Sequence, residues 1–157
     1  MFYKVGPSPD TWWGMLTVSK DEGLTWDKPF RLPNEILGPI KNKPVLLPDG
    51  RLLCGSSTEH DGWKVHMEWT SDQGQEWVKT SPLRLGGAKG AIQPTILSHG
   101  KRTELRLQIL CRSQGGGRIL ESWSADGGRT WDDLSPISLP NPNSGIDGVT
   151  LRDGRHI

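Results

Sequence analysis

A chain of 157 residues with 33% hydrophobic and 24% charged residues has the composition of one folded domain, which excludes a disordered protein. Its 19 basic and 18 acidic residues leave a net charge of +1, so no overall field attracts nucleic acid or an anionic membrane, and neither partner is expected. No apolar run approaches the roughly 18 residues of a membrane span or resembles a secretory leader. The compartment stays unknown, with the cytoplasm as the default expectation.

The composition is rich in turn residues and tryptophan, with 20 Gly, 12 Pro and 8 Trp against one Tyr and two Phe. The two cysteines, Cys54 and Cys111, form neither a disulfide framework nor a metal-binding spacing, and both are expected to be buried as small apolar side chains. Neither a metal nor another cofactor is expected.

Taken in chain order, the sequence predicts short strands separated by glycine-containing turns, with no sustained helical pattern. Each repeated unit reads as a strand, an Asp-Gly or His-Gly turn, a second strand, a variable loop, a third strand, an acid-glycine turn and a fourth strand. The predicted units are residues 1–33 as part of a unit, 38–85 and 88–139 as full units, and 144–157 as the inner strand of a further unit.

One frame occurs three times, as SKDEGLTW at 19–26, TSDQGQEW at 70–77 and SADGGRTW at 124–131. Asp21 and Asp72 are 51 residues apart, and Asp72 and Asp126 are 54 apart. In such a turn the aspartate accepts backbone hydrogen bonds, the glycine adopts a positive φ and the tryptophan packs on a neighbouring strand. The frame is therefore interpreted as structural, with these residues: Asp21, Gly23, Trp26, Asp72, Gly74, Trp77, Asp126, Gly128 and Trp131.

These three frames resemble the Asp boxes, or BNR repeats, of the sialidase superfamily. The segments GPIKNKPVLLPDGRLL and GIDGVTLRDGRHI also resemble the sialidase-like BNR family. The resemblance implies an all-β fold, a β-propeller of four-stranded blades with three blades in this chain. It implies less about activity, because Asp boxes lie opposite the active site of such enzymes and also occur in non-enzymes.

Propellers of this superfamily close with six or seven blades, whereas three blades alone would leave sheet edges uncovered. Joining the C-terminus to the N-terminus of a second copy would place Asp126 and Asp21 52 positions apart, which preserves the repeat phase. A head-to-tail homodimer that closes a six-bladed ring is therefore predicted. The alternative is a fragment of a larger propeller.

By repeat phase, one mouth of the central channel is formed by segments 38–44, 87–94 and 140–148 and by loops 6–12, 57–63 and 111–118. Lysine and arginine there suit a carboxylate, amides suit hydroxyls, and two carboxyls suit acid and base roles on an acidic sugar. His66 is expected to pack within a strand, and His99 to lie in a turn on the other face. The candidate residues are Lys43, Asn42, Gln93, Arg112 and Tyr3 for substrate binding, and Glu59, Asp147 and His60 for catalysis.

The pattern departs from that of active sialidases, which share an Arg-Ile-Pro near the first inner strand and an arginine triad. Here the corresponding segments are Asn42-Lys43-Pro44 and Ile92-Gln93-Pro94, and no full triad can be assigned. The predicted function is a sialidase-like carbohydrate-active propeller that hydrolyses or eliminates at an acidic glycan, as a glycoside hydrolase or a polysaccharide lyase. The alternatives are a non-catalytic glycan- or protein-binding propeller and an inactive fragment of a larger enzyme.

Overall fold

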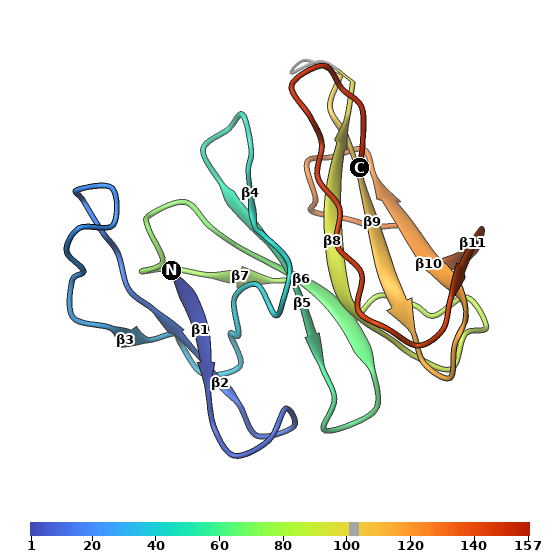
Figure 1. Cartoon of the computed structure of the whole chain (residues 1–157), viewed down its shortest axis with the longest axis horizontal. Helices are drawn as coiled ribbons and strands as arrows, with labels where there is room; N and C mark the ends of the chain where they lie inside the picture. The colour runs from blue at the N-terminus through green and yellow to red at the C-terminus, as the bar shows by residue number, and fades with distance from the viewer. Residues whose placement is uncertain (101–103) are drawn as a thin grey trace.

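The structure is a computed structural model that describes residues 1–100 and 104–157, which form three antiparallel β-sheets and no helix. Figure 1 shows the sheets in chain order, from the first strands in blue to the last in orange and red. In this described part there is consequently no helix that could cross a membrane. Residues 101–103, in the turn predicted after His99, lie outside it. The prediction of an all-β fold is confirmed.

The first sheet has three strands in the order β1-β2-β3. Tyr3 of β1 pairs with Met15 of β2, and Leu16 of β2 pairs with Phe30 of β3. Within the described residues no strand pairs with the other edge of β1, so this sheet is one strand short of the other two. The strands are β1 (Phe2–Val5), β2 (Trp13–Leu16) and β3 (Phe30–Arg31).

The second sheet has four strands in the order β4-β5-β6-β7, which are β4 (Val45–Leu46), β5 (Leu52–Thr58), β6 (Lys64–Thr70) and β7 (Val78–Lys79). Strand β6 is buried on both faces because a neighbouring sheet covers each side. Val65 and Met67 pack in the core shared with the third sheet. His66 and Glu68 point the other way, and Glu68 bonds the segment that follows the first sheet. The central sheet is thus held from both sides.

The third sheet has the order β11-β10-β9-β8, with β8 (Ala91–His99), β9 (Arg106–Ser113), β10 (Gly117–Ser124) and β11 (Ser135–Asn141). The pairing of β8 with β9 shifts between Ile92 and Thr95. Pro94 has no N–H for the ladder, and Gln93 before it has a φ of 59°, a left-handed conformation unusual for a residue with a side chain. The shift forms a bulge at the start of β8.

The last described residues, 144–157, form a small hairpin beside β8, visible in red in Figure 1. Val149 and Ile157 exchange two backbone hydrogen bonds of 2.9 and 3.1 Å. The Ser98 N–H donates to Thr150 Oγ1 at 2.9 Å, and Thr95 Oγ1 donates to the Gly148 carbonyl at 3.1 Å. The hairpin therefore packs on β8 much as a neighbouring sheet would.

Two hydrophobic clusters join the sheets. The larger lies between the second and third sheets, and its members include Leu53, Met67, Leu107, Ile109 and Leu134. The smaller lies between the first and second sheets and contains Leu16, Leu32 and Ile36, with Phe2, Phe30 and Trp77 packed against it. Both clusters follow from the period-two alternation of the strands, which puts apolar side chains on the faces that meet.

Both cysteines are buried free thiols, as predicted, and burial raises the pKa of each thiol far above its ordinary value. His66 is packed within β6, also as predicted. The prediction for His99 was wrong, because this residue ends β8 and pairs with Arg106. Its ring contacts those of Trp123 and His156, at centroid distances of 4.7 and 4.2 Å.

Candidate functional site

In each of the three Asp-box turns the aspartate accepts hydrogen bonds from the backbone N–H four residues later and from the hydroxyl two residues earlier. In the third, Asp126 accepts hydrogen bonds from the Thr130 N–H at 3.0 Å and from Thr130 Oγ1 at 2.6 Å, and Ser124 Oγ donates to the same carboxylate at 2.8 Å. Trp131 Nε1 closes the turn on the Gly128 carbonyl at 2.9 Å. The glycine has a φ of 83°, and Gly127 before it is left-handed as well. Every polar group of this carboxylate is used within the turn.

The tryptophans of the three turns differ in their surroundings. Trp77 packs against the first sheet, where its ring meets that of Phe2 edge-on at a centroid distance of 6.0 Å. Trp131 packs against the hydrophobic cluster between the second and third sheets. Trp26 is 48% exposed, so the prediction that each such tryptophan buries itself on a neighbouring strand was wrong for the first turn. No preceding sheet is present to cover it within the described residues.

A cavity of about 560 Å³ lies where the segment before β4 passes the first sheet. Its lining includes Tyr3, Lys4, Trp12 and the run Lys41–Lys43, and we call it the lysine cavity. The Asn42 amide donates to the Gln93 carbonyl at 3.1 Å, which ties this wall to the bulge of β8. The structure thus brings together three predicted binding residues, Tyr3, Asn42 and Lys43, with Gln93 directly behind them.

Gln93 is held in an unusual state. Its N–H donates to Ser57 Oγ at 3.2 Å, while its side-chain Oε1 is buried with no hydrogen-bond partner in the described part of the chain. A buried amide oxygen without a partner is unfavourable, and so is a left-handed φ at a non-glycine residue. Both features sit on one residue beside the lysine cavity, which is the kind of place where strain marks a functional site.

Asp147 lies beside the same cavity wall. Its carboxylate is 4.0 Å from Lys43 Nζ, and Thr95 Oγ1 donates to it at 3.3 Å. Lys41 Nζ donates to Asn42 Oδ1 and to the Ile146 carbonyl, both at 2.9 Å. The C-terminal hairpin therefore supplies one carboxylate to a cluster that is otherwise cationic.

Lysines dominate the electrostatics of this cluster. Lys4 Nζ donates to the Pro39 carbonyl at 2.9 Å, and burial lowers its pKa to about 8, although the nearby Glu68 opposes that shift. Lys4 is therefore still mainly a cation at neutral pH. Three lysines, Lys4, Lys41 and Lys43, line the cavity. The carboxylate of Asp147 lies near Lys43, and that of Glu68 lies near Lys4. The cavity has the charge to receive an anion.

The remaining predicted residues lie elsewhere. The guanidinium of Arg112 stacks 4.9 Å from the ring centroid of Trp63 and donates to Asn143 Oδ1 at 3.0 Å. His60 lines a separate groove between the first two sheets. Glu59 and Asp147 share neither a hydrogen bond nor a cavity among the described residues. The structure does not bring the predicted acid–base pair into contact.

Sequence reasoning missed several residues that build this region. Ser57 holds the Gln93 N–H, Thr95 holds Asp147, and Lys4 supplies a third cation. Gly145 approaches so closely that a Cβ there would lie 3.1 Å from the Lys41 side chain. Only the Gly-rich, Pro-rich character of segment 140–148 hinted at such an approach.

Comparison with solved structures finds the same fold at low sequence identity. A protein of unknown function from Dyadobacter fermentans DSM 18053 superposes with a TM-score of 0.73 at 17% identity, over 92% of this chain and 43% of that one. The Hadza microbial sialidase Hz136 gives 0.71 at 19%, over 90% and 28%. NanB sialidase from Streptococcus pneumoniae, as its K499G mutant, gives 0.67 at 19%, over 93% and 23%.

An intramolecular trans-sialidase from Ruminococcus gnavus, solved with oseltamivir carboxylate, gives a TM-score of 0.56 at 25% identity, over 82% of this chain and 27% of that one. The chain thus spans less than half the length of each of these structures. No curated protein matches its sequence.

Repeated antiparallel sheets with an Asp-box turn in each define the sialidase-like BNR-repeat fold. The chain matches the BNR repeat-like domain over residues 1–157, and it belongs to that family. The resemblance read from the three repeated frames is confirmed.

Proposed function

We propose that the chain is a carbohydrate-recognising domain that binds the carboxylate of an acidic sugar at the lysine cavity. The observation that carries this proposal is the meeting of three lysines with Asn42 and the strained Gln93 around one cavity of about 560 Å³. Lysines attract the carboxylate, and amide groups suit sugar hydroxyls.

The similar structures support this class of ligand. Two are named sialidases, and a third, the trans-sialidase, was solved with oseltamivir carboxylate, which is itself a carboxylate. Family membership supports a carbohydrate role for the fold but does not supply the arginines of an active sialidase. At the segments that correspond to Arg-Ile-Pro this chain has Asn42-Lys43-Pro44 and Ile92-Gln93-Pro94, and the cations that line the cavity are lysines.

Calorimetric titration with sialic acid and with glucuronic acid tests the proposal, with glucose as the neutral control. We expect both acids to bind and glucose to be ignored. Lys43→Ala should weaken binding of the acids about fivefold, since one charge-assisted contact is lost at an exposed position. Lys20→Ala is the matched control, because Lys20 and Lys43 are equally exposed and Lys20, among the described residues, forms an ion pair with Asp27 alone.

The pH dependence adds an independent readout. Lys4 loses its charge as the pH rises through about 8, so affinity for the acidic sugars should fall between pH 7 and 9. Absence of binding for both acids at neutral pH, in a protein with intact fold, would refute the assignment.

Catalysis is a second candidate function, favoured by the position of Asp147 beside Lys43. In that proposal Asp147 acts as acid or base, with Glu59 and His60 as its predicted partners and Arg112 as a further cation. Hydrolysis or elimination of an acidic glycoside by the chain, abolished by Asp147→Asn, would establish it. A protein that binds without turnover would leave recognition as the function.

We also propose that two copies associate head to tail, because the first Asp box and the hairpin of residues 144–157 have complementary surfaces. Between the second and third sheets, Arg51 Nη2 donates to the Gly127 carbonyl of the next Asp box at 2.7 Å, and Leu53 lies under Gly128. The C-terminal hairpin has a corresponding arginine, because Arg155 bonds Asp153 as Arg51 bonds Asp49.

The first Asp box supplies the second surface of the proposed dimer. The first Asp box offers Gly23 and an exposed Trp26 with no sheet against them in the described residues. In the proposed dimer Arg155 donates to the Glu22 carbonyl of the partner, and Ile157 packs under the partner's Gly23 as Leu53 does under Gly128.

Light scattering at several concentrations tests the association. We expect a mass near twice 17.4 kDa for the native chain and a mass of one chain for Arg155→Glu. Leu24→Asp should also give one chain, because Leu24 follows Gly23 in the first Asp box and is 85% exposed. A native chain that stays monomeric at all concentrations overturns the dimer, and the covering surface would then belong to further sheets of a longer chain.

A further inference from the structure

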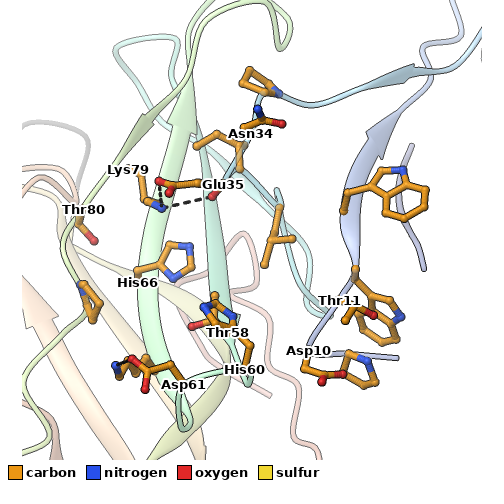
Figure 2. A pocket seen from close by; sticks show the side chains of 18 of the residues that line it. Asp10, Thr11, Asn34, Glu35, Thr58, His60, Asp61, His66, Lys79 and Thr80 are labelled. Atoms are coloured by element: carbon orange, nitrogen blue, oxygen red, sulfur yellow. Dashed lines mark hydrogen bonds and ion pairs between the residues drawn. The ribbon is translucent and has the colours of Figure 1, made fainter. Parts of the chain in front are cut away.

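A second cavity, of about 550 Å³, lies between the first and second sheets and is distinct in chemistry from the lysine cavity. We call it the intersheet groove. Figure 2 shows His66 projecting from β6, with Thr58 and His60 on the same side of the groove and Asp10 and Thr11 across from them. None of the roles considered so far uses His66.

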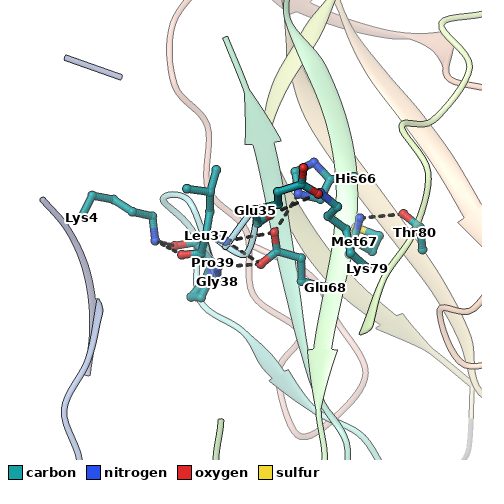
Figure 3. Close-up of polar contacts among 10 residues, drawn as sticks. All are labelled: Lys4, Glu35, Leu37, Gly38, Pro39, His66, Met67, Glu68, Lys79 and Thr80. Carbon is teal, nitrogen blue, oxygen red and sulfur yellow. Dashed lines mark hydrogen bonds and ion pairs between the residues drawn. The ribbon is translucent and has the colours of Figure 1, made fainter. Parts of the chain in front are cut away.

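Glu68 fixes the orientation of His66. The Glu68 carboxylate is fully buried, and it accepts hydrogen bonds from the Gly38 N–H at 2.6 Å and the Leu37 N–H at 3.1 Å. His66 Nε2 lies 2.8 Å from Glu68 Oε1, as Figure 3 shows. A carboxylate that takes backbone donors is an acceptor, so Nε2 carries the hydrogen in this contact.

The second ring nitrogen of His66 is therefore available to the groove. With the hydrogen on Nε2, neutral His66 presents a lone pair at Nδ1, and no described residue forms a hydrogen bond with that atom. The side chain is buried apart from 4% of its surface. An oriented acceptor that has no protein partner and opens on the groove can accept a hydrogen bond from a ligand there.

The charges around the groove are balanced. Lys64 pairs with Asp61, Lys79 lies 3.3 Å from Glu35, and the Arg31 guanidinium sits over the Trp13 ring at 5.0 Å. The groove thus has no excess charge to offer an ionic ligand, in contrast to the lysine cavity. The apolar part of its lining includes Trp12, Trp13 and three prolines.

We infer that the intersheet groove is a second ligand site, which binds a neutral saccharide through a hydroxyl group donated to His66 Nδ1. A sugar hydroxyl both donates and accepts, so it can serve Nδ1 and the polar rim of Thr58 and Asp10 together. The C–H face of a sugar ring packs on tryptophan and proline. A neutral sugar also matches the balanced charge, which an acidic sugar does not.

The test uses lactose as the probe, with the indole N–H signals of Trp12 and Trp13 followed by NMR. Trp13 lines only the intersheet groove, whereas Trp12 lines both cavities. We expect lactose to shift the Trp13 signal, and sialic acid to leave it unchanged. Lactose binding with unchanged affinity in Lys43→Ala would separate this site from the proposed acidic-sugar site.

His66→Gln should weaken lactose binding about tenfold, because the acceptor at Nδ1 is lost. His99→Gln is the matched control, since His99 is a partly buried histidine hydrogen-bonded to Gln108 away from the groove. Thr58→Val, at the rim, should weaken binding severalfold and serves where the His66 variant does not fold. An unmoved Trp13 signal in the native chain, or equal affinity in folded His66→Gln and native protein, would overturn the inference.

Discussion

Corresponding residues are buried where the second and third sheets meet, but exposed in the first Asp box and the C-terminal hairpin. Leu53 is 0% exposed, whereas Ile157 at the corresponding place in the C-terminal hairpin is 75% exposed. The side chain of Arg51 is 9% exposed and that of Arg155 is 76% exposed, although both bond an aspartate two residues earlier.

The Asp boxes show the same contrast. A Cβ at Gly128 would lie 2.8 Å from Leu53, whereas a Cβ at Gly23 would meet only Trp26, at 3.7 Å. The hydrogen bonds from the threonine to the aspartate are nonetheless alike in the two turns. The difference shows that hydrogen bonds within each turn set its conformation. How much the turn stabilises the whole fold depends on the sheet that packs against it.

Leu53→Ala should give the largest effect, because it empties a fully buried position between two sheets. We expect a loss of about 3 to 4 kcal/mol in the free energy of unfolding. Leu46→Ala, on the exposed side of the same sheet, should change it by less than about 0.5 kcal/mol. Urea unfolding of both variants checks the pair, and equal effects would contradict the role of the contact.

Gly128→Ala should give the next largest loss in the free energy of unfolding, because the new methyl group overlaps Leu53 and the residue has a positive φ of 83°. The expected loss is about 2 to 3 kcal/mol. Gly23→Ala has the same backbone strain at φ 94° without the overlap, so its loss should be smaller by about 1 kcal/mol or more. Thermal unfolding of the two variants side by side measures that difference.

Arg51→Ala removes the bond to the Gly127 carbonyl and the stacking of the guanidinium on Trp69, with an expected loss of about 2 kcal/mol. Arg155→Ala removes a solvent-exposed copy of the same side chain and should leave a monomer within about 0.5 kcal/mol of the native value. A comparable loss at Arg155 in dilute, monomeric protein would show that the hairpin needs this residue for itself.

The smallest expected effect is the loss of stability at low pH, when the Asp-box carboxylates become protonated. Hydrogen bonds from Thr25 lower the pKa of Asp21 to about 2; at Asp126 burial acts to raise it, but bonds from Thr130 bring it to about 2 as well. Since the ordinary value is 3.8, each carboxylate stabilises the fold above about pH 4, and this contribution is lost as the pH falls towards 2.

Thr25→Val and Thr130→Val should both destabilise the protein at pH 5 and converge with the native protein near pH 2. Urea midpoints over this range test whether the covered and uncovered turns titrate alike. A response confined to Thr130→Val would mean that the neighbouring sheet, and not the turn itself, sets the pKa.

The sequence alone determined the repeating part of this protein. The acid-glycine-tryptophan frame recurs at a fixed phase, and its bonds run within eight consecutive residues, so the three turns, the antiparallel strands around them and the family all follow from the residues themselves. The exposure of the tryptophan in the first turn does not follow in this way, since Trp26 needs a neighbour that local sequence does not specify.

The tertiary structure alone decided which candidate residues meet. Asn42 and Gln93 are 51 positions apart, and Lys41 and Ile146 are 105 apart, so only the packing of three sheets brings them to one cavity. The same packing separates Glu59 from Asp147, buries Glu68 and turns His66 into the intersheet groove. Repetition fixes bonds within a turn, whereas contacts between side chains from different repeats depend on how the sheets stack, which no short stretch of sequence encodes.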